Sequence, residues 1–150
     1  MVSLWDTGAM SEDQQQSEYR APPVNERGRA FDPDATESER TYAMFMHLAL
    51  LLNLTGAGGI IAFIVVIIMW QTKKKESPFL DDHGNEAVNF QISLFVWGLI
   101  LGFGAILTCG ISLVFLLAIP ILGAVGMIFA AIAAKNGEFF RYPATMRFVH

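Results

Sequence analysis

The sequence predicts an all-α integral membrane protein, a small bundle of three or four helices that cross the membrane fully or halfway. Hydrophobic residues make up 53% of the 150 residues and charged residues only 16%, whereas a soluble domain carries about 25% charge. No charged residue occurs from Tyr42 to Trp70 or from Ala87 to Ala134. Each run exceeds the roughly 18 apolar residues that indicate a membrane-spanning helix. This composition argues against a soluble enzyme, a coiled coil, a disulfide scaffold and a nucleic-acid-binding protein.

The acidic charge of the chain is concentrated at its N-terminal end. The net charge is −4, and residues 1–40 alone hold nine acidic side chains against four arginines. Few large apolar side chains accompany them, so we expect residues 1–40 to form a disordered acidic tail, followed by a membrane domain over 41–150. The first residues lack the features of a signal peptide, and the first apolar segment is expected to direct insertion. Thr36 and Glu39 have the spacing of a capping box, which places the first helix start near residues 35–38.

The first apolar segment, about residues 42–71, is interrupted by a glycine-rich polar stretch at Thr55–Gly59. A straight helix over Tyr42–Trp70 would measure about 43 Å, against a hydrocarbon core of about 30 Å. Two arrangements fit: one tilted or kinked span, or a hairpin of two short helices. We favour the hairpin or broken helix, because a glycine-rich break inside a bilayer frees backbone groups and has to be explained.

The second apolar run is long enough for two spans, about 87–107 and 113–134, with a turn between them. Cys109 lies in this turn and is expected to be a buried, inert thiol. Small residues recur every fourth position along both spans, which is typical of closely packed helices. We expect this seam to form within one chain rather than between subunits. Its candidate residues are Gly98, Gly102, Gly126 and Ala130.

Basic residues predict the orientation of the chain in the membrane. Lys73–Lys75 follows the first segment, and three further basic residues follow the last span. Two spans separate these clusters, so both lie on one side, which the positive-inside rule makes cytoplasmic. We therefore expect a multi-pass protein of the bacterial cell membrane, with a cytoplasmic polar loop at 73–86 and a cytoplasmic, interfacial C-terminal tail at 135–150.

The polar stretch before the second run carries the candidate contact residues. Ser77 and Pro78 are typical of a helix start, with serine as the cap and proline at the first position. Asn85 and Asn89 share a helix face close to Glu86, and amides that enter a membrane helix must face protein or water. A structural network is the favoured interpretation, and a partner-contact surface is the alternative. The residues assigned to it are His83, Gly84, Glu86, Asn89 and Gln91.

The same polar stretch contains acidic residues and a histidine, which are side chains that can bind metals or act in catalysis. Asp81, His83 and Glu86 are possible ligands, but they do not have the spacing of a zinc site. No nucleophile or substrate pocket accompanies His83, so we predict no metal, no cofactor and no enzymatic activity. His47 and Asn53 lie inside the first apolar segment, where we expect a neutral histidine that is hydrogen-bonded across helices.

Three stretches of the sequence resemble a family of small uncharacterised bacterial membrane proteins. They are ERxYAxxxHLxxLLN (39–53), IIMWQTKKKESPFLDDHGNEAVNFQIS (67–93) and AAKNGEFFRYP (133–143). That family is distantly similar to the small membrane subunit of the chloroplast inner-envelope protein-import translocon (Tic-twenty-like). The resemblance covers about residues 39–148, and HGxEAxNFQ (83–91) is its most specific part. It implies a bundle of three or four membrane helices in a bacterial cytoplasmic membrane and carries no catalytic residues.

We expect the protein to act as a scaffold or accessory subunit of a larger membrane complex, without enzymatic activity. Its partners are then the lipid bilayer and other membrane proteins or further copies of the chain, and no nucleic acid. The alternative is a pore or protein-translocation component, formed as an oligomer or with partners. In that case polar side chains would line the path, namely His47, Asn53, Asn89 and Gln91.

Overall fold

The computed structural model describes residues 22–55 and 58–149, and the regular secondary structure of this part is helical. The helices are α2 (Glu37–Ala49), the 3₁₀ helix η1 (Leu50–Leu54), α3 (Gly58–Lys73), α4 (Pro78–Leu107) and α5 (Leu113–Lys135). By length and composition, α4 and α5 can each cross a membrane, and α3 is a shorter apolar helix. The prediction of an all-helical chain with two long apolar segments is confirmed.

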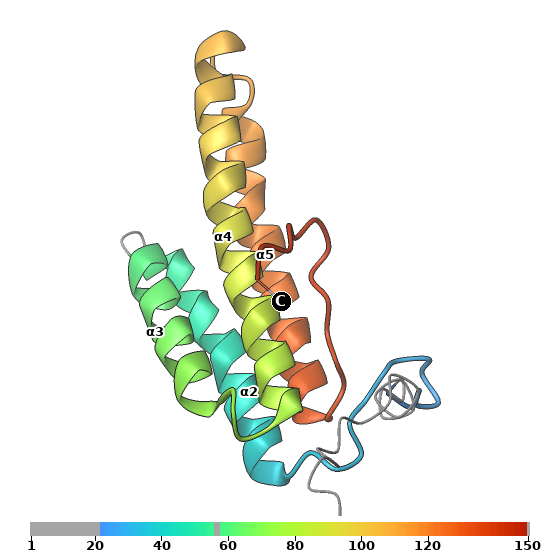
Figure 1. The fold of residues 1–150 in the computed structure, drawn as a ribbon. Coiled ribbons are helices and arrows are strands. Elements are labelled where there is room, and N and C mark those ends of the chain that lie inside the picture. Colours follow the sequence, from blue (N-terminus) through green and yellow to red (C-terminus); the bar gives the residue numbers. More distant parts are fainter. Residues whose placement is uncertain (1–21, 56–57, 150) are drawn as a thin grey trace, which may run out of the picture.

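The first apolar segment folds back on itself, so that η1 and α3 meet at the predicted break (Figure 1). Tyr42 near the start of α2 donates its hydroxyl hydrogen to the carbonyl of Met69 near the end of α3, at 2.9 Å. A Cβ atom at Gly58 would lie 1.8 Å from the carbonyl oxygen of Leu52. Only glycine allows this approach of the two backbones, and it is the reason for the glycine-rich break that the sequence shows.

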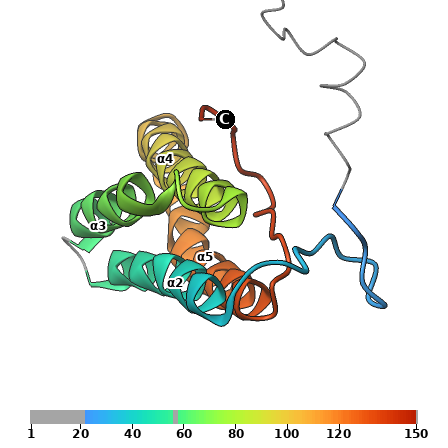
Figure 2. The same ribbon diagram turned by 60° about the horizontal axis from the view of Figure 1, so that its bottom comes forward.

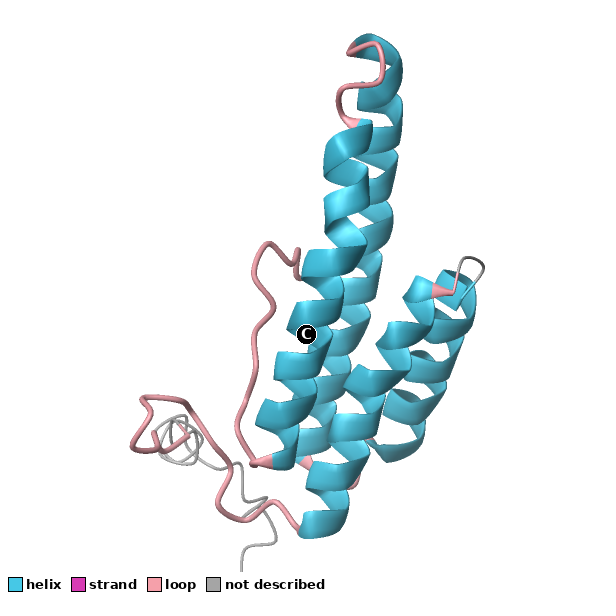
Figure 3. Cartoon of the chain, turned by 180° about the vertical axis from the view of Figure 1, so that it is seen from behind, coloured by secondary structure: helices cyan, strands magenta, loops and turns pink. Residues whose placement is uncertain are grey.

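The two long helices, α4 and α5, form a second hairpin that projects beyond the first (Figures 1 and 3). Apolar side chains near its tip are exposed, among them Leu107 at 85%. The turn between the helices uses two residues in the left-handed region, Cys109 with φ 50° and Gly110 with φ 91°. Cys109 is exposed. The expectation of a buried thiol is therefore wrong, because the turn lies beyond the packed part of the bundle.

Two helix starts were predicted, and only the first of them has the predicted side-chain cap. Thr36 and Glu39 form the predicted capping box at the start of α2. Helix α4 begins at Pro78, as Ser77–Pro78 predicts, but the Ser77 side chain makes no capping hydrogen bond. Residues 78–86 of the predicted polar loop are therefore the first turns of a 30-residue helix. The first turns of α4 are polar because they contact other segments of the chain, as described below.

Helices α2, α3, α4 and α5 lie side by side near the end of the molecule where α4 begins (Figure 2), and their buried apolar side chains form one core there. Large buried apolar side chains come from α2, η1, α3, α4 and α5. Burying each such side chain contributes about 1.5–3 kcal/mol. The buried side chains include Met46, Leu50, Val66, Phe79 and Met127.

Residues 22–36 fold over the end of α5, in contrast to the predicted disorder of residues 1–40. The carboxylate of Glu138 is only 3% exposed and accepts hydrogen bonds from the side chains of Asn25 at 2.8 Å and Arg29 at 2.9 Å. Arg27 lies 3.5 Å from the same carboxylate. A buried carboxylate requires such partners, and this requirement orders the segment. Residues 1–21 of the predicted tail lie outside the described residues.

Gly84 on α4 lies against Trp70 of α3, and this contact yields a prediction. A Cβ atom at Gly84 would lie 2.1 Å from Cδ1 and 2.8 Å from Cβ of Trp70, whose indole N–H donates to Asp81 at 2.7 Å. We expect Gly84→Ala to lower the free energy of unfolding by about 1–3 kcal/mol through overpacking. Denaturant unfolding in detergent micelles measures this change. The control is Gly98→Ala on the same helix, where a Cβ would meet no atom within 4 Å; equal losses in both variants would contradict the prediction.

Candidate functional site on the polar face of α4

Five side chains with hydrogen-bonding groups lie along one face of α4, at successive spacings of four, three, four and four residues. Positions three and four apart are neighbours on a helix surface, so these residues form a continuous row. Each of them bonds to residues 138–149, the chain segment after α5, which we call the C-terminal strap. The row, called the polar face of α4 below, consists of Asp82, Glu86, Asn89, Ser93 and Trp97.

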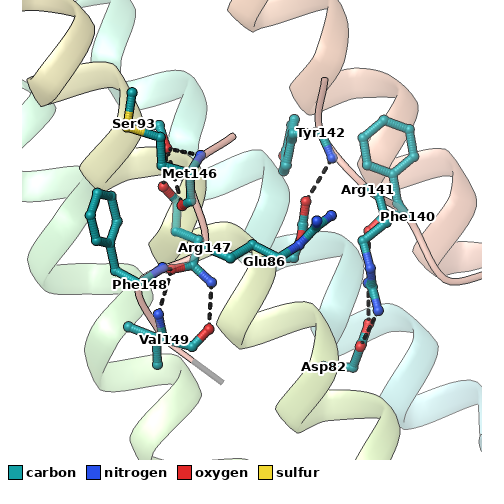
Figure 4. Close-up of polar contacts among 11 residues, drawn as sticks. Asp82, Glu86, Ser93, Phe140, Arg141, Tyr142, Met146, Arg147, Phe148 and Val149 are labelled. Atoms are coloured by element: carbon teal, nitrogen blue, oxygen red, sulfur yellow. Dashed lines mark hydrogen bonds and ion pairs between the residues drawn. The ribbon is translucent and has the colours of Figure 1, made fainter. Parts of the chain in front are cut away.

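Charged groups hold the first part of the strap (Figure 4). Arg141 binds Asp82 through two hydrogen bonds of 2.5 and 2.7 Å, and the Asp82 carboxylate raises the pKa of the Arg141 guanidinium above its ordinary value. The Glu86 carboxylate, which is almost fully buried, accepts the backbone N–H of Tyr142 at 2.7 Å. Arg147 lies 3.7 Å from the other oxygen of Glu86. These carboxylates therefore bind the strap at both a side chain and the backbone.

Neutral polar groups hold the rest of the strap. The side-chain oxygen of Asn89 accepts the backbone N–H groups of Phe148 and Val149, and its amide nitrogen donates to the carbonyl of Val149, each at 2.8 Å. The Ser93 hydroxyl oxygen accepts the N–H of Met146 at 2.8 Å. Because the strap is not helical, its own backbone supplies few partners, and these α4 side chains take their place.

The order of these contacts shows the path of the strap. It leaves α5 beside the first turns of α4 and reaches the level of Trp97, whose indole N–H donates to the carbonyl of Ala144 at 3.2 Å. Ala144 has a φ of 59°, and beyond it the strap returns past Ser93 to Asn89 (Figure 1). The strap is thus a narrow loop that lies along α4, with an unusual backbone conformation at its tip.

A buried chain of three side chains joins the strap to α2 and α4. The Tyr142 hydroxyl lies 3.0 Å from Nδ1 of His47, and Nε2 of His47 lies 2.9 Å from Nδ1 of His83. Both imidazole rings are completely buried. The His83 ring lies between Phe79, at a centroid distance of 4.4 Å, and Phe139, at 6.2 Å. Tyr142 is therefore bound at both its backbone, by Glu86, and its hydroxyl, by His47.

A second polar contact joins the first hairpin to α4. Asn53 in η1 and Gln91 in α4 exchange two side-chain hydrogen bonds of 2.8 and 2.9 Å. Gln91 also donates to the carbonyl of Gly59 at 3.2 Å, close to the start of α3. Reciprocal amide pairs satisfy both partners away from water. This pair holds the turning point of the first hairpin against the middle of α4.

The predicted contact residues therefore divide into three groups. Glu86 and Asn89 bind the strap, and His83 contacts His47, the partner of Tyr142. Gln91 binds Asn53 instead. Gly84 lies against Trp70. Further members of the polar face were not among the predicted contact residues. Their helical spacing from Glu86 was a usable signal, but the strap that they bind carries no such pattern. These missed residues are Asp82, Ser93 and Trp97 on α4, and Arg141 and Tyr142 on the strap.

The residues of the predicted packing seam occupy different surroundings. Gly126 lies against Tyr142, since a Cβ atom there would be 3.3 Å from the ring, and Ala130 is completely buried. A Cβ atom at Gly98 or Gly102 would meet nothing within 4 Å. Gly98 borders a pocket that Leu116, Ile119 and Pro120 of α5 also line. The part of Gly98 and Gly102 in a packing seam stays a prediction.

The described residues offer an apolar groove but no group of ligands for a metal. A groove of about 420 Å³ lies between α4, α5 and the strap. Within residues 22–55 and 58–149, no three His, Cys, Asp or Glu side chains come close enough together to hold a metal ion. Side chains that line the groove include Leu94, Trp97, Phe115, Ile119, Leu122 and Thr145.

A family model places the chain among known sequences. The model of the magnetosome magnetite crystal formation protein family matches residues 38–149, which is well over half of the chain. The chain belongs to this family. No curated protein and no solved structure matches it. The family's region includes the strap and all the helices described above apart from Glu37, the first residue of α2, and it leaves out the segment 22–36.

Membership in the magnetosome family corrects the resemblance drawn from the sequence. The stretches at 39–53, 67–93 and 133–143 lie in the region that the magnetosome family model matches, and the proposed similarity to a chloroplast import subunit is wrong. These stretches consist largely of apolar helix positions, caps and interfacial aromatic residues. Such features follow from packing helices in a membrane and occur in unrelated families.

The contacts of Asn89 yield a second prediction. Asn89→Leu removes three hydrogen bonds to Phe148 and Val149 without a large change in volume. We expect faster hydrogen exchange of strap amides and a loss of about 1–3 kcal/mol in the free energy of strap opening, since backbone groups lose their partners. Hydrogen exchange with mass spectrometry measures both quantities. The matched control is Asn85→Leu, one turn earlier, where the side-chain oxygen has no partner; equal exchange in the two variants would disprove the role of Asn89.

Proposed function

We propose that this chain is a non-enzymatic integral membrane protein that acts as a scaffold or accessory subunit in the membrane where magnetite crystals form. The family match over residues 38–149 carries this proposal. The two long apolar helices α4 and α5 support a location in a membrane. The family's description names the process, which is magnetite crystal formation. The helical fold is the basis for proposing that the chain contributes to this process as a membrane scaffold.

The use of the polar side chains supports a structural role. Asp82, Glu86, Asn89 and Ser93 each bond to the strap, and Gln91 bonds to Asn53. These groups are the polar side chains that an active site or a polar path would need, and their hydrogen-bonding capacity is used within the chain. The groove beside the strap is apolar. The surface that remains for partners is therefore mainly the exposed apolar part of α4 and α5.

The proposed topology follows from the charges at the helix ends. Lys73, Lys135 and Arg141 lie at or beyond the ends of α3 and α5, close to the start of α4. We propose that this end is cytoplasmic, that α4 and α5 cross the bilayer, and that the α2–α3 hairpin enters it partway. Exposed isoleucines on α3, such as Ile64 and Ile68, fit a lipid-facing hairpin. The partners are then lipids, other membrane proteins and further copies of the chain.

A complementation experiment tests the proposed function. In a magnetite-forming bacterium that lacks its own members of this family, the tagged chain is expected to co-purify with magnetically isolated crystal-bearing membranes and to restore crystal size in electron micrographs. The matched control is the Gly84→Leu variant, whose Cβ would overlap Trp70. Insertion of the wild-type chain into cell membranes, without enrichment on crystal-bearing membranes or any change in crystal size, would contradict the proposal.

A further inference from the structure

The row Tyr142–His47–His83 can form a continuous chain of hydrogen bonds when both rings are neutral, with all donors pointing in one direction. A neutral imidazole has one N–H donor and one acceptor nitrogen. If the Tyr142 hydroxyl donates to Nδ1 of His47, then Nε2 of His47 carries the hydrogen and donates to Nδ1 of His83. Nε2 of His83 then carries a hydrogen that has no partner among the described residues. Every ring nitrogen in this row except Nε2 of His83 therefore has a hydrogen-bond partner, and this pattern of donors and acceptors requires both rings to be neutral.

The strap closes this row from water. Tyr142 and Phe139 belong to the strap, and they contact His47 and His83 directly. The other cover comes from Phe79 on α4, whose ring centroid is 4.4 Å from that of His83. Both histidines are completely buried in this closed arrangement. If the strap leaves α4, the rings lose two aromatic neighbours and the hydroxyl partner, and they gain access to protons.

We propose that His47 and His83 form a proton-sensitive latch that holds the C-terminal strap closed while both rings are neutral and releases it when they are protonated. Two protonated rings carry N–H groups on all four nitrogens, so His47 and His83 then have no acceptor between them. A buried charge without a partner is also costly. The open state therefore binds protons that the closed state excludes, and acidification below about pH 6.5 favours opening.

Other charged groups face the latch and must be separated from it. Glu86 on α4 binds the Tyr142 backbone, and its carboxylate also titrates in acid. Asp82 is paired with Arg141, Glu138 with Arg29, and Arg147 lies near Glu86. The Asp82–Arg141 pair, whose side chains are 28% and 48% exposed, contributes little to stability, whereas the carboxylates of Glu138 and Glu86 are buried. Glu86 is thus the group whose titration most needs a control, because it and His47 hold the same residue, Tyr142.

Hydrogen exchange of the full chain in lipid nanodiscs tests the latch. After correction for the intrinsic pH dependence, we expect strap amides in 139–149 to exchange about tenfold faster near pH 5 than near pH 7.5, while α5 amides stay unchanged. The double variant His47→Gln/His83→Gln keeps donors and acceptors but does not titrate, and its strap exchange should not depend on pH. Glu86→Gln keeps an acceptor for Tyr142 and should retain the pH dependence of the wild type.

A second measurement on the wild-type chain covers the case in which the double variant does not fold. Nitrogen-15 chemical shifts of labelled histidine report ring protonation directly. The latch requires that the rings of His47 and His83 become protonated at the same pH at which the strap opens. A strap that stays closed near pH 5, an opening that precedes histidine protonation, or a double variant that keeps the wild-type pH dependence would each overturn the proposal.

Discussion

The described fold depends on one constraint: backbone N–H and C=O groups that lie away from water need hydrogen-bond partners. Helices meet this requirement by themselves, but the C-terminal strap does not, because it runs beside α4 without helical structure. The polar face of α4 supplies the missing partners, most completely at Asn89, which binds two N–H groups and one carbonyl. The same constraint explains the Asn53–Gln91 pair, which lies where η1 ends and α3 begins and so supports a second interruption of helical structure.

Tyr142 connects the polar face of α4 with the buried pair His47 and His83. Its backbone N–H binds Glu86, its hydroxyl binds His47, and its ring stacks on Phe90 at a centroid distance of 3.9 Å. The absence of a side chain at Gly126 allows the ring to lie against α5, where a Cβ atom would be 3.3 Å away. Four contacts of different kinds thus meet at one residue of the strap. A change in any of them alters how firmly the strap is held.

The sequence predicts what local patterns determine and misses what distant contacts determine. The glycine-rich break, the capping box at Thr36 and the two long apolar helices follow from local residue patterns, and the structure contains them. The hydrogen bonds between the strap and the polar face of α4 join residues about 50 to 60 positions apart. No local sequence pattern indicates such pairs. Small residues at helical spacing led to the prediction of a packing seam at Gly98 and Gly102. A Cβ atom at either position would meet nothing within 4 Å, although α5 also lines the pocket at Gly98.

Residues of the N-terminal segment bind a buried carboxylate that lies in a distant region of the chain. Glu138 lies inside the region that defines the family, whereas its partners Asn25, Arg27 and Arg29 lie before it. A carboxylate so deeply buried is unfavourable without partners of opposite charge. The acidic composition of residues 1–40 suggested a solvated tail, but Arg27 and Arg29 within it bind the buried carboxylate of Glu138. The start of the strap at Glu138 is consequently held from both sides, by the N-terminal segment and by the helix that precedes it.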